Sequence, residues 1–395
     1  MKVLYITYDG ISDALGQSQI VPYINGLSAL GNDITVLSFE KENISNCCRN
    51  RFDKKVCWKM LSYHKYPLIL STIFDIMEGM RVGAVILLRE KINVIHVRGY
   101  VPAVIGSCLK RLFGIRFIFD MRGMWPEEKV DARAWKKSGL FFKIVKCFEK
   151  YFLYSADTII VLTDRFKQII ATTRCLGAKK IRVIPTCVDI NNFSVSRSGC
   201  SGEESGVKGK FTILYLGSLG TFYALVEMID FFSIIQTNIH FKNPHFRILT
   251  NNPSDVIHQA MQLRNIPKRN YSIRQIPHVD LKDALPLADV SLMFYKRSLS
   301  GAGCCPTKFG ESLACGLPVI INAGIGDTES IIESEKIGVI VKEFTSEAYR
   351  DAMERLIPLF SNKEELRLKC HQAAIKHFSL NKGIDAYQEI YHDLA

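Results

Sequence analysis

The chain has 395 residues, 48% of them hydrophobic and 23% charged, which is ordinary for a globular protein and enough for two domains that each bury a core. No apolar run reaches the roughly 18 residues of a membrane span, and the N-terminus reads as a first strand without a signal-peptide region. The 12 cysteines are scattered, and the adjacent pairs at 47–48 and 304–305 suit neither a disulfide framework nor a zinc site. A reduced, cytoplasmic chain is therefore expected.

The net charge of +12 is unevenly distributed along the chain. Residues 1–190 hold 29 Lys and Arg against 17 Asp and Glu, a difference of +12, whereas the remaining 205 residues hold 22 of each. A basic N-terminal half predicts an anionic partner. The sequence has no zinc-finger, RNP-like or helix-turn-helix signature, so nucleic acid is not expected. An anionic lipid surface fits better, and it would place the protein on the inner face of the plasma membrane.

The chain opens as a parallel α/β unit. Residues 1–8 read as a strand, 9–17 as a glycine-containing loop, Ser18 as a helix N-cap, 19–30 as a helix and 34–39 as the second strand. The loop lacks the Gly-x-Gly-x-x-Gly fingerprint, which argues against a nicotinamide or flavin dinucleotide.

Two basic, aromatic segments of this half each allow two interpretations. Residues 52–80 interleave aromatics with lysines, which suits a membrane interface or the lipid part of an acceptor, although a strand and a helix with solvated lysines is favoured. Residues 140–152 carry apolar side chains at helical spacing opposite lysines and a glutamate. Packing of that apolar face against the sheet is the default expectation, with membrane contact through the lysine face second.

Charged residues collect at two predicted strand ends, where α/β active sites form. Residues 92–97 form a strand that ends in Arg98, whose guanidinium suits a phosphate or an acceptor anion. His96 is expected to be a buried, hydrogen-bonded core residue. Asp120 and Arg122 follow the next strand, and together with Arg98 they are the candidate catalytic, acceptor-side residues. A structural Asp–Arg pair is the alternative.

A second domain is expected after a linker. Residues 194–210 contain Ser, Gly and charge with almost no apolar side chain, so the domains are predicted at 1–193 and 211–379. A strand at 211–216 leads into a glycine loop in which Gly217 and Ser218 are candidates to cradle a pyrophosphate. Further strands are predicted at 246–250, 271–273 and 288–294.

The stretch 306–320 is the most informative part of the sequence. It predicts a turn, a short helix ended by Gly316, and a buried strand from Pro318. The first residue of that helix is Thr307, and free N–H groups at a helix N-terminus suit a phosphate, as does the charge of Lys308. Glu311, one turn further on, suits a pair of ribose hydroxyls. An ordinary helix–strand unit with an incidental Glu is equally compatible with the spacing alone.

This stretch resembles the nucleotide-sugar site of the family 4 glycosyltransferases, and residues 181–193 and 211–221 resemble that family more loosely. The resemblance implies the GT-B fold, in which two Rossmann-like, doubly wound parallel-sheet domains face a cleft. It also implies that a helix at about 380–395 packs back on the first domain. The family pattern has two glutamates, of which Glu311 matches the second, the ribose ligand. The first, which contacts the transferred sugar, would fall at Gly303 and is missing.

Several further site residues follow from the resemblance. Gly16 and Gln17 correspond to the glycine loop that contacts donor or acceptor, with an ordinary turn glycine as the alternative. The family's usual cations near the glycine loop are absent, and Ser218 occupies the position of one of them. Lys296 and Lys308 are the candidate replacements, with ordinary solvated lysines as the alternative. The sequence has no Asp-x-Asp, and the resemblance likewise implies a metal-independent enzyme without a cofactor.

The resemblance implies transfer of a hexosyl or N-acetylhexosaminyl group, with retention of configuration, from a nucleotide diphosphate sugar to an acceptor hydroxyl. With the basic N-terminal half it suggests a lipid-linked glycan acceptor, as in polysaccharide or lipopolysaccharide biosynthesis at a membrane surface. Two alternatives stay open: a nucleotide-sugar epimerase of the same fold, and an inactive scaffold that binds sugar nucleotides.

Overall fold

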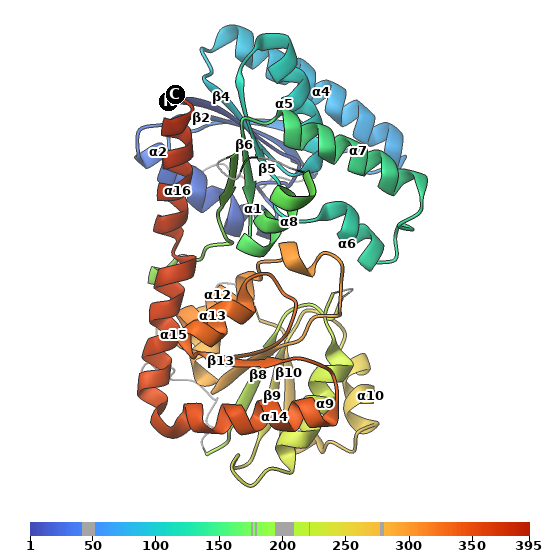
Figure 1. The fold of residues 1–395 in the computed structure, drawn as a ribbon, viewed down its shortest axis with the longest axis vertical. Coiled ribbons are helices and arrows are strands. Elements are labelled where there is room, and N and C mark those ends of the chain that lie inside the picture. Colours follow the sequence, from blue (N-terminus) through green and yellow to red (C-terminus); the bar gives the residue numbers. More distant parts are fainter. Residues whose placement is uncertain (42–51, 175–176, 178–179, 194–208, 221, 277–279) are drawn as a thin grey trace. The chain divides into compact units, whose positions relative to one another are not determined.

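The structure is a computed structural model that describes the chain except for residues 42–51, 175–176, 178–179, 194–208, 221 and 277–279. It divides into two compact units, Met1–Cys187 with Leu380–Ala395 and Val188–Ser379 (Figure 1). Nearly all of the predicted linker at 194–210 lies outside the described residues.

Unit 1 is built on a seven-stranded sheet in the order β3-β2-β1-β4-β5-β6-β7, and every pairing is parallel. Its inner strands are buried on both faces and therefore read as continuous apolar runs, which is why they were predictable from the sequence. The strands are β1 (Lys2–Thr7), β2 (Asp33–Glu40), β3 (Cys57–Ser62), β4 (Val94–Arg98), β5 (Arg116–Asp120), β6 (Thr158–Val161) and β7 (Ile181–Val183).

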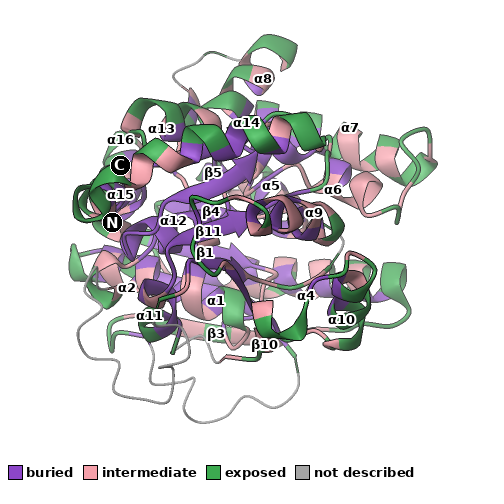
Figure 2. Cartoon of the chain, turned by 90° about the horizontal axis from the view of Figure 1, so that it is seen from below, coloured by how far each residue is buried: buried purple, intermediate pink, exposed green. Residues whose placement is uncertain are grey.

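Helices cover both faces of this sheet. One core contains side chains of α4, α5, α7 and α8, and the core on the other face contains side chains of α2 and α16. Figure 2 shows the buried strands between more exposed helices. The helices of unit 1 are α1 (Ala14–Gln19), α2 (Val21–Ala29), α4 (Leu68–Arg89), α5 (Tyr100–Phe113), α6 (Trp125–Asp131), α7 (Leu140–Ser155), α8 (Asp164–Arg174) and α16 (Leu380–Asp393).

The helix α16 packs against α2 although more than 350 residues separate them in the chain. Tyr387 and Tyr391 of α16 are 4% and 0% exposed, and the OH of Tyr391 lies 2.8 Å from Nδ1 of His96 on β4. The last helix of the chain therefore completes the core of the first unit.

The opening of the chain differs from the prediction. The segment predicted as a loop contains helix α1, and Ser18 lies inside that helix, where its hydroxyl donates to the carbonyl of Ala14 at 2.9 Å. The predicted N-cap at Ser18 is wrong because serine also bonds back to a carbonyl one turn earlier inside a helix.

Unit 2 holds a six-stranded parallel sheet in the order β10-β9-β8-β11-β12-β13. This is the doubly wound order, in which the direction of winding reverses between the adjacent strands β8 and β11. The strands are β8 (Thr212–Leu216), β9 (His245–Leu249), β10 (Tyr271–Arg274), β11 (Val290–Met293), β12 (Val319–Asn322) and β13 (Gly338–Val341). The α-helices are α9 (Leu225–Gln236), α10 (Asp255–Gln262), α11 (Leu281–Ala284), α12 (Thr307–Ala314), α13 (Thr328–Glu335), α14 (Ser346–Leu356) and α15 (Lys363–Phe378), and short 3₁₀ turns lie at Ile190–Asn192, Lys268–Asn270, Leu285–Leu287, Gly301–Gly303 and Ile357–Asn362.

The central helix–strand stretch of unit 2 forms as predicted. Helix α12 ends before Gly316, whose φ of 73° is left-handed, and β12 begins at Val319. Phe309 and Leu313 of α12 are fully buried in the core beneath the helix. Among the helices of the described residues, none combines the length and the apolar character that a membrane crossing needs.

Candidate active site

The first candidate site lies in unit 2, at the carboxyl ends of β8 and β11. Ligands of doubly wound sheets bind at this reversal of strand order. The glycine loop directly after β8 meets the first turn of α12 there. Gly217 has a φ of 151°, and a Cβ on it would lie 3.0 Å from Cε of Lys308 and 3.3 Å from its Nζ. The structure therefore brings together two of the predicted phosphate-binding residues.

A cluster of tyrosines holds Lys308 in place. Its Nζ donates to the hydroxyl of Tyr223 at 3.2 Å and lies 5.4 Å from the centre of that ring. Tyr223 in turn packs against Tyr295 with ring centres 4.9 Å apart. The hydroxyl of Tyr215 donates to the carbonyl of Ser218 at 2.6 Å and so fixes the glycine loop. Burial raises the pKa of Tyr215, so this hydroxyl stays a neutral donor.

The sequence analysis missed these tyrosines. They come from three separate segments, and only the pairing of β8 with β11 and a bridge between Tyr223 and Tyr295 bring them together. The aromatic residues at the end of β8 and β11 were visible in the sequence, but nothing in their spacing indicated contact.

The first turn of α12 offers backbone donors and two charged side chains. The N-cap residue is Pro306, whose side chain makes no hydrogen bond to the first N–H groups of the helix. These N–H groups begin at Thr307. Lys308 and Glu311 are three residues apart and therefore lie on the same side of the helix. Glu311 is only 5% exposed. A cation, helix N–H groups and a carboxylate thus lie within one turn, which suits a phosphate and a hydroxyl-bearing group.

The backbone of Lys296, the second lysine predicted for this site, lies close to the tyrosine cluster. Lys296 follows β11, its side chain is exposed, and its N–H donates to the carbonyl of Phe222 at 2.8 Å. This contact places the Lys296 backbone beside the segment that carries Tyr223. The turn Gly301–Gly303 packs closely on the loop after β12, because a Cβ on Gly301 would lie 2.6 Å from the carbonyl oxygen of Gly324.

The second candidate site lies in unit 1, at the carboxyl ends of β1 and β4, where that sheet also reverses its winding. Nε of Arg98, 5% exposed, lies 3.6 Å from a carboxylate oxygen of Asp9, and its Nη1 donates to the carbonyl of Gln19 at 3.4 Å. Nη2 of Arg122 donates to Oε1 of Gln19 at 3.5 Å and to the hydroxyl of Thr186 at 3.4 Å. Gln19, which the sequence analysis did not consider, thus joins both arginines.

Asp120 is fully buried beneath these arginines. It accepts a hydrogen bond of 2.8 Å from the hydroxyl of Tyr387, and its Oδ2 lies 3.8 Å from Nε2 of His96. Burial acts to raise the pKa of Asp120, but the charge of Arg122, with His96 and Arg98, outweighs burial and holds that pKa below its ordinary value. Asp120 is therefore ionised at neutral pH.

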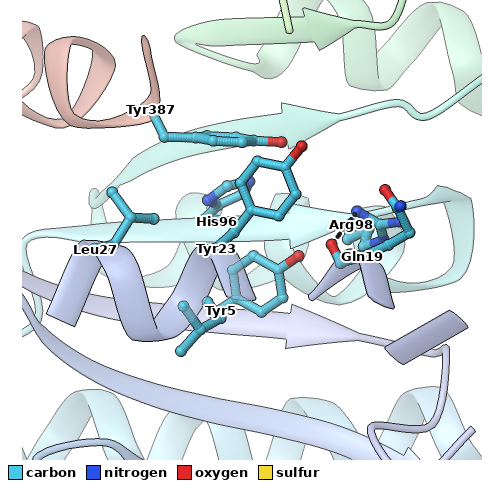
Figure 3. A pocket seen from close by; sticks show the side chains of 8 residues that line it. Tyr5, Gln19, Tyr23, Leu27, His96, Arg98 and Tyr387 are labelled. Atoms are coloured by element: carbon cyan, nitrogen blue, oxygen red, sulfur yellow. Dashed lines mark hydrogen bonds between the residues drawn. The ribbon is translucent and has the colours of Figure 1, made fainter. Parts of the chain in front are cut away.

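His96 is the buried, hydrogen-bonded histidine that the sequence predicted. It is 1% exposed, and burial lowers its pKa although the nearby Asp120 carboxylate partly offsets that effect. The side chains around it form a small hollow, in which the hydroxyls of Tyr5, Tyr23 and Tyr387 point to the side of Arg98 (Figure 3). Burial raises the pKa of Tyr5 to about 12.

Four buried polar atoms of this cluster have no hydrogen-bond partner within the described protein. They are Nε2 of His96, Nε of Arg98, Oδ1 of Asp120 and Nη1 of Arg122. Nε of Arg98 and Nε2 of His96 already face the carboxylates of Asp9 and Asp120. Since buried polar atoms are normally paired, Oδ1 of Asp120 and Nη1 of Arg122 are the atoms best suited to a polar ligand. The predicted acceptor-side residues Arg98, Asp120 and Arg122 thus form one cluster, more elaborate than a simple Asp–Arg pair.

Gly16 and Gln17 do not lie in a loop, contrary to prediction, since both are part of α1. A Cβ on Gly16 would lie 2.2 Å from the carbonyl oxygen of Gly10, so this buried glycine permits the helix to touch the preceding backbone. Nε2 of Gln17 donates to the carbonyl of Ile11 at 2.5 Å, which stabilises the same contact between α1 and the segment before it. Contact of Gly16 with a ligand stays a prediction.

Two family models match almost all of the chain. The model described as Glycosyltransferase Family 4 matches residues 20–192, and the model described as Glycosyl transferases group 1 matches residues 202–377. The chain belongs to the family 4 glycosyltransferases. The resemblance stated from the sequence is confirmed, and so is a glycosyltransferase activity.

Solved structures resemble the glycosyltransferase over its whole length. Sucrose-phosphate synthase from Thermosynechococcus elongatus is 14% identical, with a TM-score of 0.73 over 100% of this chain and 99% of its own. Anabaena Alr3699/HepE in complex with UDP is 12% identical, with a TM-score of 0.72 over 100% of both chains. The apo form of the lipopolysaccharide outer core galactosyltransferase WaaB is 11% identical, with a TM-score of 0.68 over 100% of both chains. No curated protein sequence matches the chain.

These likenesses confirm the predicted GT-B fold with its two parallel sheets. Gly303, where the sequence resemblance predicts the family's first carboxylate, is buried in the 3₁₀ turn before α12. Among the described residues there is no group of three or more His, Cys, Asp or Glu side chains arranged to hold a metal ion.

Proposed function

We propose that this glycosyltransferase moves a hexosyl or N-acetylhexosaminyl group from a nucleoside diphosphate sugar to an acceptor hydroxyl, with retention of configuration and without a metal or a cofactor. The observation that carries the proposal is the position of Lys308, which lies against Gly217 at the N-terminus of α12. In our proposal this turn binds the diphosphate, Ser218 and Thr307 contribute backbone groups, and Glu311 accepts hydrogen bonds from the ribose.

The chemistry requires stabilisation of the leaving diphosphate, on which negative charge develops as the sugar departs. Fixed donors aimed at such a charge are among the largest contributions to catalysis. Here Lys308 and the first N–H groups of α12 would supply these donors. The hydrogen bond to Tyr223 holds the ammonium group of Lys308 in position. Lys296, exposed at the end of β11, is the candidate for a second cation.

The acceptor would be held by unit 1. Asp120, Arg98 and Arg122 combine an ionised carboxylate with two guanidinium groups whose polar atoms are not all paired within the protein. A polar acceptor that carries hydroxyls and an anionic group fits this set of donors and acceptors. We propose a lipid-linked glycan at the inner face of the plasma membrane. The structural similarity to a lipopolysaccharide galactosyltransferase supports such an acceptor. The structural similarity to HepE, which was solved in complex with UDP, supports a uridine nucleotide as the donor.

The proposal is tested by thermal unfolding of the protein with a panel of nucleoside diphosphates and their sugars, beginning with UDP. At 100-fold excess over its dissociation constant, the correct ligand stabilises the protein by about 2.7 kcal/mol. Glu311→Gln and Lys308→Met are each expected to remove most of that shift. Glu333→Gln, an exposed glutamate of α13, is the matched control and should leave the shift unchanged.

Two results would contradict the proposal. Failure of every nucleotide to stabilise the protein would exclude a donor site in unit 2. Tight nucleotide binding without transfer to any acceptor, and without release of free epimerised donor, would instead favour the inactive scaffold, for which the missing carboxylate at Gly303 is the supporting observation.

A further inference from the structure

Helix α4 exposes an apolar stripe to solvent along its first half. The residues that recur on its outer side at helical spacing are large and apolar, and Phe74 is 53% exposed. Opposite them, Ser71, Asp75 and Gly79 face the interior. The stripe consists of Leu70, Ile73, Phe74 and Met77, and Tyr66, Leu68 and Ile69 extend it at the N-terminal end.

Helix α7 exposes a second stripe, which contradicts the expectation that its apolar side packs against the sheet. Phe152 is buried in the core and Val145 packs partly against it. The other apolar side chains predicted for the core are exposed, as Phe148 at 46% illustrates. They recur every three or four residues and are Phe141, Ile144, Phe148 and Tyr151, with Leu140 at the end of the helix.

The two stripes belong to one layer of helices. Helices α4, α5 and α7 pack side by side on one face of the unit 1 sheet, with α5 in the middle (Figure 1). Each of these helices runs opposite to the parallel strands, so their N-terminal halves lie at the carboxyl edge of the sheet. We call the eight residues of the two central stripes the α4–α7 apolar face. The α4 stripe and the beginning of the α7 stripe therefore lie toward the same edge of the sheet as Arg98 and Asp120.

Exposed basic side chains lie on or next to the two helices of this face. Lys65 precedes α4, and Lys143 and Lys150 lie along α7 beside its apolar stripe; all three are exposed. Lys136 and Lys137, just before α7, are exposed as well. The nearby acidic groups are occupied, because Glu78 pairs with Arg81 at 2.5 Å and Glu149 is buried with Lys146 2.5 Å away.

We propose that the α4–α7 apolar face docks on an anionic lipid bilayer, with both helices lying along the headgroup region. An exposed apolar stripe flanked by lysines is the pattern of interfacial helices, in which aromatic and aliphatic side chains enter the acyl boundary while lysines meet anionic headgroups. A scattered exposed Leu is unremarkable in a protein, but two exposed apolar stripes in one helix layer indicate a partner.

A second copy of the chain is the less suitable occupant. In a symmetric dimer the same face meets itself, so the lysines of one face would approach those of the other. Lipid headgroups with negative charge remove that repulsion. The inference does not depend on which sugar is transferred or on the nucleotide site in unit 2.

Flotation of the full-length protein with vesicles tests this proposal. Vesicles of phosphatidylcholine with phosphatidylglycerol should carry the protein upward at low salt, and less of it at high salt, whereas phosphatidylcholine alone should bind weakly. The double variant Phe74→Gln/Phe148→Gln is expected to lower partitioning by roughly tenfold or more. The variant Lys143→Glu/Lys150→Glu should bind less to vesicles that contain phosphatidylglycerol, while its weak binding to phosphatidylcholine alone should not change.

Matched controls separate docking from folding and from donor binding. Val256→Gln/Leu263→Gln removes exposed apolar side chains from unit 2, and Lys268→Glu reverses an exposed charge there, so both should float like the wild type. All variants should keep the wild-type unfolding temperature and nucleotide-induced shift. Absence of vesicle binding, or wild-type binding by Phe74→Gln/Phe148→Gln, would overturn the proposal. A dimer in solution that this variant dissociates would overturn it in favour of a second copy.

Discussion

The side chain of His96 links three parts of unit 1 that are distant in sequence. Its Nδ1 lies 2.8 Å from the hydroxyl of Tyr391 on α16, and its Nε2 faces Asp120 at the end of β5. Tyr387 of α16 donates to the same carboxylate. A protonated imidazole would introduce a further charge into this buried set of groups, so His96 favours the neutral form.

The neutral state of His96 predicts that stability falls in mild acid. Because its pKa is lowered by burial, the unfolded chain takes up a proton as the pH falls through about 6.5 while the folded protein does not. Stability is therefore fully present above that pH and is lost toward the folded pKa, by at most about 1.4 kcal/mol per pH unit. Asp120, whose pKa is also lowered, adds a loss only below about pH 4.

Urea unfolding at several pH values between 7.5 and 5.5 measures this effect. His96→Gln should be less stable at neutral pH but should show a flatter dependence on pH. His392→Gln, an exposed position on α16, should keep the wild-type slope. The stability of His96→Gln should still depend weakly on pH, because burial also lowers the pKa of His245. Equal slopes in wild type and His96→Gln would show that this histidine is not the titrating group.

At the scale of single elements, the contact between α1 and the loop before it decides how the chain opens. Gly16 lets the helix approach the backbone of Gly10 and Ile11, where a Cβ would lie 2.2 Å from one carbonyl oxygen and 2.6 Å from the Cα of Ile11. The neighbouring atoms are backbone, which cannot rotate away as a long side chain can. A methyl group at this position must displace the helix or the loop.

We therefore expect Gly16→Ala to destabilise unit 1 by about 1–3 kcal/mol, the usual cost of overpacking. The measurement is the free energy of unfolding in urea, followed by circular dichroism. Gly177→Ala is the control, since no described atom beyond its chain neighbours lies within 4 Å of a Cβ there. A Gly16→Ala variant as stable as the wild type would mean that the loop can move aside at no cost.

The elements themselves were largely predictable, whereas their contacts were not. Buried parallel strands are continuous apolar runs, and Gly316 marks the end of α12, so periodicity and helix-ending residues place them. Helix α7 was also placed correctly, but its exposed and buried sides were not. Spacing shows that a helix has an apolar side, and it cannot show whether a protein core covers that side.

The candidate sites divide in the same way. Lys308 and Glu311 were found because they lie within one helical turn of a recognisable segment. Tyr223 and Gln19 were missed because their roles arise from strand order and from packing between distant segments. No local pattern around either residue carries that information.

At the scale of the whole molecule, unit 1 is discontinuous in sequence and unit 2 is continuous. The chain passes from one unit to the other between Cys187 and Val188 and returns between Ser379 and Leu380. Val188 and Ser379 form a parallel bridge, and the N–H of Val188 donates to the carbonyl of Phe378 at 2.8 Å. The outgoing and returning segments are therefore adjacent.

This topology predicts how fragments behave. Residues 188–379 expressed alone should fold and bind the nucleotide, because among the described residues their core clusters contain side chains of this unit only. Residues 1–187 alone should not reach a native state, since they lack the buried tyrosines of α16. Joining 380–395 to residue 187 through a short Gly-Ser linker should restore folding, because Gly383 lies against Cys187.

Near-ultraviolet circular dichroism and amide hydrogen exchange of the three fragments provide the measurement. A native-like spectrum for residues 1–187 alone would show that α16 is dispensable for this core. An unfolded fragment 188–379 would show that unit 2 depends on unit 1.

The return of the chain at Leu380 also sets an order of events on the ribosome. Domains generally fold as they emerge, the N-terminal one first. Here residues 1–187 need α16, which is translated after unit 2, so unit 2 is free to fold before unit 1 is complete. One face of β1 and β4 therefore stays incompletely covered until α16 has been translated, and exposed apolar surface of this kind is what chaperones shield from aggregation.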